Sequence, residues 1–149
     1  MRAVVQRILR GRVLVEDRVV GAIDRGLLVY LGMGATDGEA EAQYLADKLA
    51  GLRVFEDAAG KINLDVQAVG GAMLVIPQFT LYGDVRRGRR PAFDQALEPV
   101  AAEGLYQSVV TRLRARGLRV ETGAFRAHML VESTNDGPIT LLVDSARLF

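Results

Sequence analysis

The stretch Gly26-Leu27-Leu28-Val29-Tyr30-Leu31-Gly32 is a short, uninterrupted apolar run with a glycine at each end. A strand with one face in water alternates apolar and polar residues, whereas this run contains no charged position to turn toward solvent. We therefore predict a strand that is buried on both faces.

Strand-like segments lie on both sides of this run. Gly11 separates the first two, the polar turn Glu16-Asp17-Arg18 precedes the third, and Gly70-Gly71 opens the fourth. The turn Asn135-Asp136-Gly137-Pro138 separates the last two. The predicted strands are Arg2–Leu9, Arg12–Glu16, Val19–Ile23, Ala72–Leu81, Leu118–Glu121, Arg126–Glu132 and Ile139–Asp144.

Two helices interrupt the strands. The first begins near Thr36-Asp37-Gly38-Glu39, which has the spacing of a capping box. The second begins at Pro99, because proline has no N–H to satisfy in a first helical turn, and ends at Gly117, which suits a left-handed position. The helical spacing places these residues on the buried faces: Leu45, Leu49, Leu52, Leu105, Val109 and Leu113.

Strands at both ends with two helices between them predict an α+β fold with a largely antiparallel or mixed, barrel-like sheet. The chain has 149 residues and contains no repeat, low-complexity tract or linker. We therefore expect a single domain over residues 1–149.

Composition excludes several classes of function. The chain has no cysteine, which rules out disulfides, a thiolate nucleophile and iron–sulfur clusters. Its one histidine, His128, makes a His-rich metal site improbable, and we expect neither a metal nor a cofactor. No apolar stretch approaches the length that spans a bilayer, and the N-terminus does not resemble a signal peptide, so we expect a cytoplasmic protein that does not enter membranes.

Net charge also limits the partners. With 19 basic and 18 acidic residues the net charge is +1, so any contact with RNA must come from a local patch. The candidate patch is the loop Arg86-Arg87-Gly88-Arg89-Arg90, whose guanidinium groups could bind phosphates bidentately. The alternative is a solvated surface loop with no specific role.

Two irregular segments are candidates for chemistry. In Val75-Ile76-Pro77-Gln78-Phe79-Thr80-Leu81 a proline interrupts a strand, which exposes backbone amides of Gln78 and Phe79 beside the hydroxyl of Thr80. The alternative is a plain strand with a bulge near Pro77. In Asn135-Asp136-Gly137-Pro138-Ile139-Thr140 a functional turn would present rigid carbonyls, and the alternative is a tight hairpin turn.

Other catalytic patterns are missing. His128 is interpreted as a solvent-side or hydrogen-bonded residue rather than a catalyst, and no Ser/His/Asp constellation, phosphate-binding loop or GxGxxG run is present. The residues alone therefore predict only an α+β domain with two irregular strand ends.

Taken together, these segments resemble the D-aminoacyl-tRNA deacylases over nearly the whole chain. The resemblance rests on segments in the family's order: Met1-Arg2-Ala3-Val4-Val5-Gln6-Arg7, Leu52-Arg53-Val54-Phe55-Glu56-Asp57, Lys61-Ile62-Asn63-Leu64, Gln78-Phe79-Thr80-Leu81, Gly88-Arg89-Arg90-Pro91, Val120-Glu121-Thr122-Gly123 and Asn135-Asp136-Gly137-Pro138-Ile139-Thr140. It implies the family's fold and an ester hydrolase that releases D-amino acids from tRNA for chiral proofreading.

The resemblance also implies how L-amino acids are rejected. The family works as a homodimer in which the Gly137-Pro138 segment, with a cis bond, enters the partner's pocket. Its carbonyls hold the substrate's α-amino group, and the turn leaves no room for an L side chain. Glycine has no side chain to reject, so glycyl-tRNA is a further expected substrate. Substrate-binding residues implied in this way are Gly137, Pro138, Asn135, Met129 and Arg7, with Arg7 bracing the turn.

Hydrolysis is implied to occur at Gln78, Phe79 and Thr80. Backbone amides near Phe79 and Thr80 suit an oxyanion hole. Thr80 is either the nucleophile or a supporting hydroxyl, and in the competing mechanism the RNA's own 2′-hydroxyl activates water. We favour the latter because no base is visible to activate a threonine hydroxyl. The arginine loop, Arg86, Arg87, Arg89 and Arg90, is the expected tRNA contact.

The chain departs from the family at three positions. The family usually has serine where this chain has Pro77, so a hydroxyl and an amide donor are missing there. A related branch with another amino-acid preference also has proline, but with a smaller residue in place of Phe79, so Phe79 favours the D-specific type. Arg126 and His128 stand near positions where the family commonly has glycine and aspartate. The alternative to an enzyme is a catalytically silent nucleic-acid-binding module on the same fold.

Overall fold

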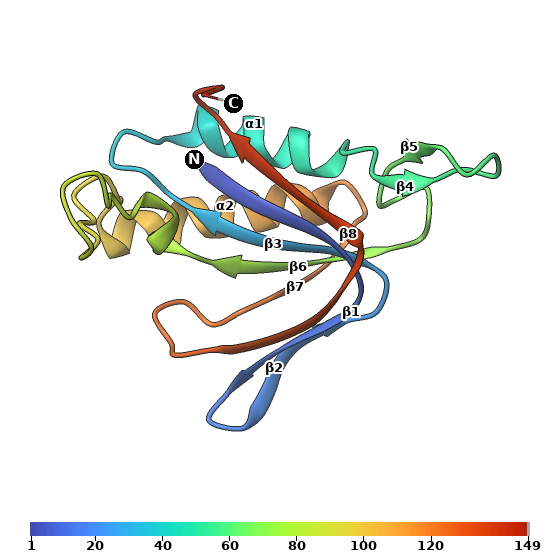
Figure 1. The fold of residues 1–149 in the computed structure, drawn as a ribbon, viewed down its shortest axis with the longest axis horizontal. Helices are drawn as coiled ribbons and strands as arrows, with labels where there is room; N and C mark the ends of the chain where they lie inside the picture. The colour runs from blue at the N-terminus through green and yellow to red at the C-terminus, as the bar shows by residue number, and fades with distance from the viewer. Residues whose placement is uncertain (149) are drawn as a thin grey trace.

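The computed structural model describes residues 1–148 and consists of one mixed sheet with two α-helices packed on one face (Figure 1). The six-stranded sheet has the order β2-β1-β3-β6-β7, and β8 pairs with β1, while β4 and β5 form a separate small sheet. The elements are β1 (Arg2–Val15), β2 (Arg18–Ile23), β3 (Gly26–Gly32), α1 (Glu39–Ala50), β4 (Phe55–Glu56), β5 (Ile62–Leu64), β6 (Ala72–Pro77), the 3₁₀ helix η1 (Phe79–Tyr82), α2 (Pro99–Ala115), β7 (Arg119–Thr122) and β8 (Leu130–Asp144).

The predicted central strand is confirmed. β3 has the predicted bounds, and every residue in it except Tyr30 is buried. It pairs parallel to β6, with Leu28 opposite Leu74, and β6 pairs parallel to β7. Because the remaining pairs are antiparallel, the sheet is mixed, as the sequence predicted.

The prediction of two strands separated by Gly11 is wrong, because β1 runs through this residue without a break. Gly11 pairs with Ile23 of β2 on one side and Ser133 of β8 on the other. A Cβ at Gly11 would lie 2.9 Å from the Cδ1 atom of Ile8. The glycine therefore serves close packing inside a strand rather than a turn.

The C-terminal strands were also divided wrongly. β8 is one strand, and the Asn135–Pro138 segment is a bulge within it rather than a hairpin turn. Gln6 pairs with Thr140, but Ile8 pairs with Asn135, so residues 136–139 lie outside the ladder. The segment before Leu130 is a turn, so the predicted strand over Arg126–Glu132 begins four residues too early.

The strand predicted over Ala72–Leu81 ends at Pro77. The next N–H, that of Gln78, donates to the carbonyl of Leu31 at 2.8 Å, after which the chain turns into η1. Because Pro77 has no N–H to donate to the ladder, the strand ends at this residue. The plain-strand alternative for this segment is therefore wrong.

The helices follow their predicted signals with one change. α2 starts at Pro99 and is followed by Gly117 at φ +82°, as predicted. α1 is capped two residues later than predicted: the carboxylate of Glu41 accepts the N–H of Gly38 at 2.9 Å, and the Thr36/Glu39 pair is not used. Asp37 takes no part in this cap, and its carboxylate binds the N-terminal ammonium group.

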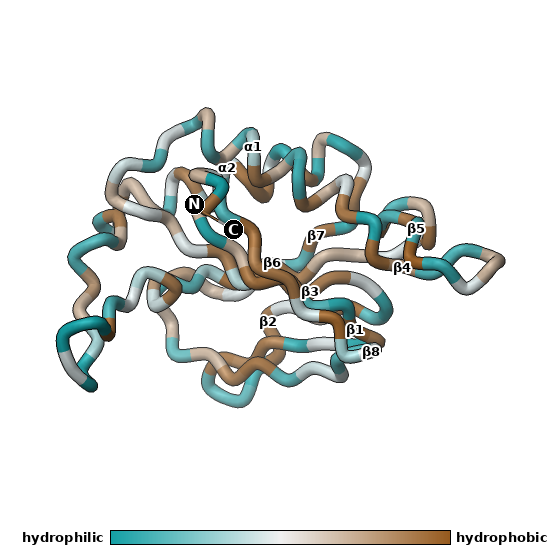
Figure 2. The backbone as a smooth tube through the Cα atoms, turned by 45° about the horizontal axis from the view of Figure 1, so that its top comes forward, coloured by the Kyte–Doolittle hydropathy of each residue, from teal (hydrophilic) through white to brown (hydrophobic). Residues whose placement is uncertain are grey.

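Hydrophobic side chains fill both sides of β3 and β6, the apolar centre of the tube in Figure 2. One cluster packs between the sheet and the helices, and a smaller one around Ile8, Leu28 and Leu74 fills the concave side. β2 curls against β7, since Arg119 Nη2 lies 3.5 Å from the carbonyl oxygen of Ala22. The barrel-like prediction is therefore confirmed as a nearly closed sheet.

Candidate active site

One cavity opens where the three parallel strands end, at the left of Figure 1. It has a volume of about 670 Å³. Met33 follows β3, Pro77 ends β6 and is followed by Gln78 and Phe79, and Phe125 to Met129 follow β7, so each strand delivers part of the wall. The beginning of α2 and Phe93 form the opposite wall. Of the predicted site residues, Gln78, Phe79 and Met129 line this cavity.

The turn after β6 leaves two backbone amides free. The first N–H groups of a helix have no acceptor within that helix, and Phe79 and Thr80 are the first residues of η1. Within residues 1–148 neither N–H has a backbone acceptor. Phe79 and Thr80 are both exposed, so their amides are available to a ligand oxygen.

The Thr80 hydroxyl is held by its neighbour. Its oxygen accepts a short hydrogen bond from Nε2 of Gln78. Within residues 1–148 no carboxylate or imidazole is hydrogen-bonded to it. An amide donor orients a hydroxyl but cannot remove its proton, so this geometry does not activate Thr80 as a nucleophile.

The cavity wall is largely aromatic and aliphatic. The rings of Phe79 and Phe93 meet edge to face with centroids 5.0 Å apart, and Phe79 keeps 58% of its surface exposed. On the other side the ring of Phe125 lies 6.0 Å from that of Tyr106, whose hydroxyl donates to the Val75 carbonyl at 2.8 Å. Sequence reasoning missed Phe93, Phe125, Arg126 and His128 as lining residues.

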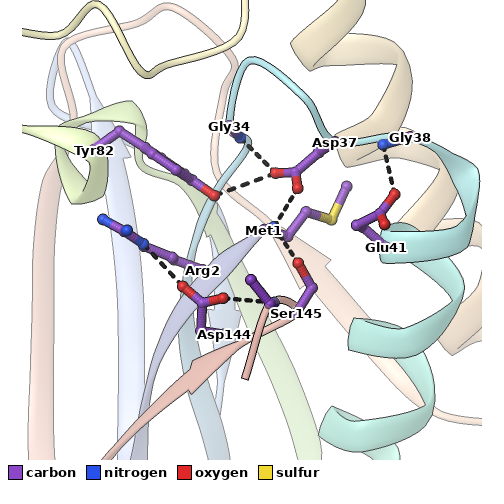
Figure 3. Close-up of polar contacts among 10 residues, drawn as sticks. Met1, Arg2, Gly34, Asp37, Gly38, Glu41, Tyr82, Asp144 and Ser145 are labelled. Atoms are coloured by element: carbon purple, nitrogen blue, oxygen red, sulfur yellow. Dashed lines mark hydrogen bonds and ion pairs between the residues drawn. The ribbon is translucent and has the colours of Figure 1, made fainter. Parts of the chain in front are cut away.

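The turn is supported from behind by the N-terminus (Figure 3). The α-ammonium of Met1 lies 2.5 Å from Oδ1 of Asp37. The other oxygen of Asp37 accepts the N–H of Gly34 at 2.5 Å and the hydroxyl of Tyr82 at 3.2 Å. Burial and the adjacent Asp37 carboxylate raise the pKa of Tyr82, so this last residue of η1 stays a neutral donor.

Arg2 completes this support. Its Nη1 donates to the Leu81 carbonyl at 3.2 Å, and its guanidinium lies 4.6 Å from the centre of the Tyr82 ring. Its Nε is 3.0 Å from Oδ2 of Asp144, at the end of β8 (Figure 3). The N-terminus is therefore linked to η1 through Asp37, and the end of β8 is linked to it through Arg2.

The Gly137–Pro138 bulge is held by residues of its own chain. The peptide bond between Gly137 and Pro138 is cis, as expected. Oδ1 of Asn135 accepts the N–H of Ile139 at 3.0 Å, and its Nδ2 donates to Oγ1 of Thr140 at 3.1 Å. Both ends of the Asn135 side chain are therefore engaged in closing the bulge.

The buried side chain of Arg7 holds the bulge in place. Its Nη1 donates to the Val54 carbonyl at 2.8 Å. Its Nε lies 3.0 Å from Oδ2 of Asp136 and 3.3 Å from the carbonyl oxygen of the same residue. Gly137 has φ +125° and its Cβ would lie 2.9 Å from Ile139 Cγ1, so only glycine fits there.

The structure does not bring the two groups of predicted residues together. Gly137, Pro138, Asn135 and Arg7 are absent from the wall of the cavity formed by Gln78, Phe79 and Met129. β8 bends near its middle at the right of Figure 1, whereas the cavity lies at the opposite ends of the strands. Gly137 and Pro138 are exposed to solvent.

The arginine loop projects beyond η1 and is exposed. Arg86 is paired with Asp84, with 2.5 Å between Nη2 and Oδ2. Hydrogen bonds from the side chain and the backbone N–H of Arg86 lower the pKa of Asp84 to about 2. Within residues 1–148 the side chains of Arg87, Arg89 and Arg90 form no ion pair, so three of the four arginines are free to meet phosphates.

Residues 1–148 contain no group of three or more His, Asp or Glu placed to hold a metal ion. No helix in this part of the chain is long and apolar enough to cross a membrane. The features described above that could act on a ligand are the free backbone amides of η1, the apolar cavity and the Gly137–Pro138 bulge.

A sequence-family model described as D-Tyr-tRNA(Tyr) deacylase matches residues 4–144. The chain belongs to this family. The deacylases of Koribacter versatilis and Anaeromyxobacter dehalogenans, both named D-aminoacyl-tRNA deacylase, are 59% and 61% identical over 149 residues and are matched over their full length and that of this chain. The predicted family and its ester hydrolase activity on aminoacyl-tRNA are thus confirmed.

Two solved structures have the same fold as this chain. A c-Myc DNA Unwinding Element Binding Protein aligns with a TM-score of 0.91 at 38% identity, covering 97% of this chain and 98% of that one. A probable eukaryotic D-amino acid tRNA deacylase aligns with a TM-score of 0.84 at 20% identity, covering 95% and 97%, which shows the shared fold.

Proposed function

We propose that this chain removes D-amino acids from tRNA by hydrolysing the ester to the terminal adenosine, and that the Gly137–Pro138 bulge of a partner subunit excludes L-amino acids. The observation that carries the proposal is the separation of the two groups of residues. The cavity that Phe79 lines lies beside free backbone amides, and the rigid, exposed bulge contributes no residue to its wall.

Charge stabilisation is assigned to η1. As water attacks the ester carbonyl, negative charge develops on the carbonyl oxygen. The N–H groups of Phe79 and Thr80 would donate to that oxygen, and their fixed positions mean that no reorganisation is needed during the reaction. Tyr82 and Leu81, anchored by Asp37 and Arg2, keep this turn in place.

Water activation is assigned to the substrate. The Thr80 hydroxyl is oriented by Gln78, but no base is placed to take its proton. The 2′-hydroxyl of the terminal adenosine lies next to the ester in any aminoacyl-tRNA and can position the attacking water. Thr80 would then support the reaction through hydrogen bonding and would not form an acyl intermediate.

The proposed gate works by shape. Carbonyl groups of the bulge would accept hydrogen bonds from the substrate α-ammonium, which leaves the hydrogen of a D residue, but not the side chain of an L residue, facing the turn. Glycine presents hydrogen on both sides, so glycyl-tRNA would also be hydrolysed. Arg7 and Asn135 would act through the bulge, because their polar groups are engaged within their own chain.

A homodimer would supply the gate to each cavity. Among the strands of residues 1–148, β8 has a free edge opposite β1 and carries exposed apolar side chains, among them Leu130 and Leu142, which a second copy could cover. A stable interface needs at least about 1,000 Å² of total buried area. The free arginines Arg87, Arg89 and Arg90 would bind tRNA phosphates outside the cavity.

Complementation between two variants tests this arrangement. Phe79→Pro removes an amide of the proposed oxyanion site, and Gly137→Ala adds a Cβ to the bulge. In a two-fold dimer with the gate supplied by the partner, refolding the two variants together restores one complete site per mixed dimer, or about a quarter of wild-type activity on D-tyrosyl-tRNA. If gate and cavity act in the same chain, the mixture stays as inactive as its components.

A nucleic-acid-binding module without catalysis is the second candidate, and the similarity to the c-Myc DNA Unwinding Element Binding Protein favours it. Deacylation of D-tyrosyl-tRNA by the purified chain separates the two. The deacylase is expected to release D-tyrosine faster than the buffer control and to leave L-tyrosyl-tRNA intact. Binding without release of D-tyrosine would support the silent module.

A further inference from the structure

The turn between β7 and β8 places two basic side chains at the mouth of the cavity. Arg126 and His128 both line the cavity and are both exposed to solvent. Between them Ala127 donates its N–H to the Ala124 carbonyl at 3.3 Å, which fixes the turn. Because β7 is the parallel neighbour of β6, the turn lies beside the residues that follow β6.

Arg126 occupies a backbone conformation that favours glycine. Its φ is +60°, in the left-handed region, where a Cβ crowds the backbone. Strain of this kind persists where a side chain has a task, and it identifies a candidate for function. A glycine would satisfy the turn without strain, so the retention of arginine needs an explanation beyond folding.

The charge of Arg126 is not used inside the chain. Within residues 1–148 neither Arg126 nor His128 forms an ion pair or a side-chain hydrogen bond. The one carboxylate that lines the cavity belongs to Glu98, and it accepts the N–H groups of Val100 and Ala101 at the start of α2. The mouth is therefore left with unpaired positive charge.

We propose that Arg126 and His128 form a phosphate subsite that binds the RNA backbone next to the esterified nucleoside. This inference rests on the proposed function. With the ester at Phe79 and Thr80, the polynucleotide must leave through the mouth of the cavity, and its nearest phosphodiester passes these side chains. A guanidinium binds a phosphate through two parallel N–H donors, which suits a residue fixed at the rim.

The test compares two substrates for the full-length protein: D-tyrosyl-tRNA, and D-tyrosine esterified to free adenosine, which has the reacting ester but no phosphate. Arg126→Gly should raise KM for the tRNA by about fivefold, the loss expected for one exposed charge-assisted contact, and leave kcat unchanged. KM for the adenosine ester should not change. Arg126→Lys should recover part of the affinity for tRNA.

Arg147→Gly is the matched control. Arg147 also has a left-handed φ, +55°, carries the same charge and does not line the cavity. Both glycine variants lose one positive charge and relieve the same kind of strain, and Arg147→Gly also loses the contact of its guanidinium with the Tyr44 ring, 5.6 Å from the ring centre. The Tm of Arg126→Gly should therefore not fall below that of Arg147→Gly, and KM for tRNA should rise only for Arg126→Gly. His128→Ala should raise KM for the tRNA by a smaller factor and leave KM for the adenosine ester unchanged.

The outcomes separate this inference from the proposed function. If wild-type protein hydrolyses both substrates but Arg126→Gly leaves KM for tRNA unchanged, the phosphate subsite is wrong and the deacylase stands. An equal rise in KM for both substrates also overturns the subsite, because it indicates a distorted cavity. If wild-type protein hydrolyses neither substrate, the proposed function itself fails.

Discussion

The turn after β6 and the bulge in β8 both interrupt strands, but they leave their polar groups in opposite states. The turn leaves the N–H groups of Phe79 and Thr80 without acceptors within residues 1–148. In the bulge, Arg7 and Asn135 engage the surrounding carbonyl, carboxylate and amide groups. The first interruption therefore offers free N–H donors to a ligand, whereas the second is a rigid turn held in place by side chains of its own chain.

The largest expected effect comes from removing a free amide. Phe79→Pro deletes one N–H at the first position of η1, where proline is tolerated. We expect kcat for D-tyrosyl-tRNA to fall by about 10²–10³, as for the loss of one oxyanion donor. Phe79→Ala is the control, since it removes the ring but keeps the N–H. Equal losses in both variants would assign the effect to the ring.

The bulge should respond in stability as well as in activity. Arg7→Met leaves the Val54 carbonyl and the Asp136 carboxylate without their shared partner, which should cost about 2–4 kcal/mol of unfolding free energy. Denaturant unfolding measures the loss, and the ratio of D- to L-tyrosyl-tRNA hydrolysis should fall with it. Arg12→Met removes an exposed ion pair with Glu132 and should do far less. A stable Arg7→Met protein with intact selectivity would contradict the bracing role.

Thr80→Ala should have a smaller effect on rate. The hydroxyl only accepts a hydrogen bond from Gln78, so its removal should lower kcat by less than about tenfold, whereas loss of a nucleophile costs roughly 10⁴-fold or more. Single-turnover deacylation measures this step. An acyl group on Thr80 detected by mass spectrometry would overturn our interpretation of the turn.

The smallest effect is expected outside both regions. Arg87→Ala with Arg90→Ala should raise KM a few-fold and reduce the salt dependence of binding by just under one unit for each lost phosphate contact, with kcat unchanged. Arg86→Ala is the control and should change KM less, because Asp84 already neutralises Arg86. A collapse of kcat instead would place the loop in the active site.

The predictions made from the sequence succeeded for some strands and failed for others. β3 was predicted to the residue, because an apolar run between glycines leaves few alternatives. The end of β6 at Pro77 follows from the missing N–H, although the strand was predicted to run further. Gly11 and the bulge were misjudged because local sequence does not show that β1 offers partners on both edges.

The lining of the cavity was only partly predictable. Gln78 and Phe79 were predicted from the proline that interrupts the strand, Met129 came from the family resemblance, and the structure places all three in the lining of the cavity. Phe93 and Phe125 were missed, because their proximity depends on the parallel arrangement of β3, β6 and β7, which no local pattern displays. Arg126 was predicted at the start of a strand and noted as a departure from the family, and its left-handed backbone became visible only in the structure.

The pairing of the first strand with the last has a consequence for how the chain folds. Arg2 pairs with Asp144, so one edge of β1 stays open until almost the entire chain has been synthesised. Contacts between residues so distant in sequence slow folding, and we expect refolding in milliseconds to seconds rather than the microseconds of small helical bundles. Stopped-flow refolding measures this rate, and a chain truncated before β8 should aggregate through the uncovered edge of β1.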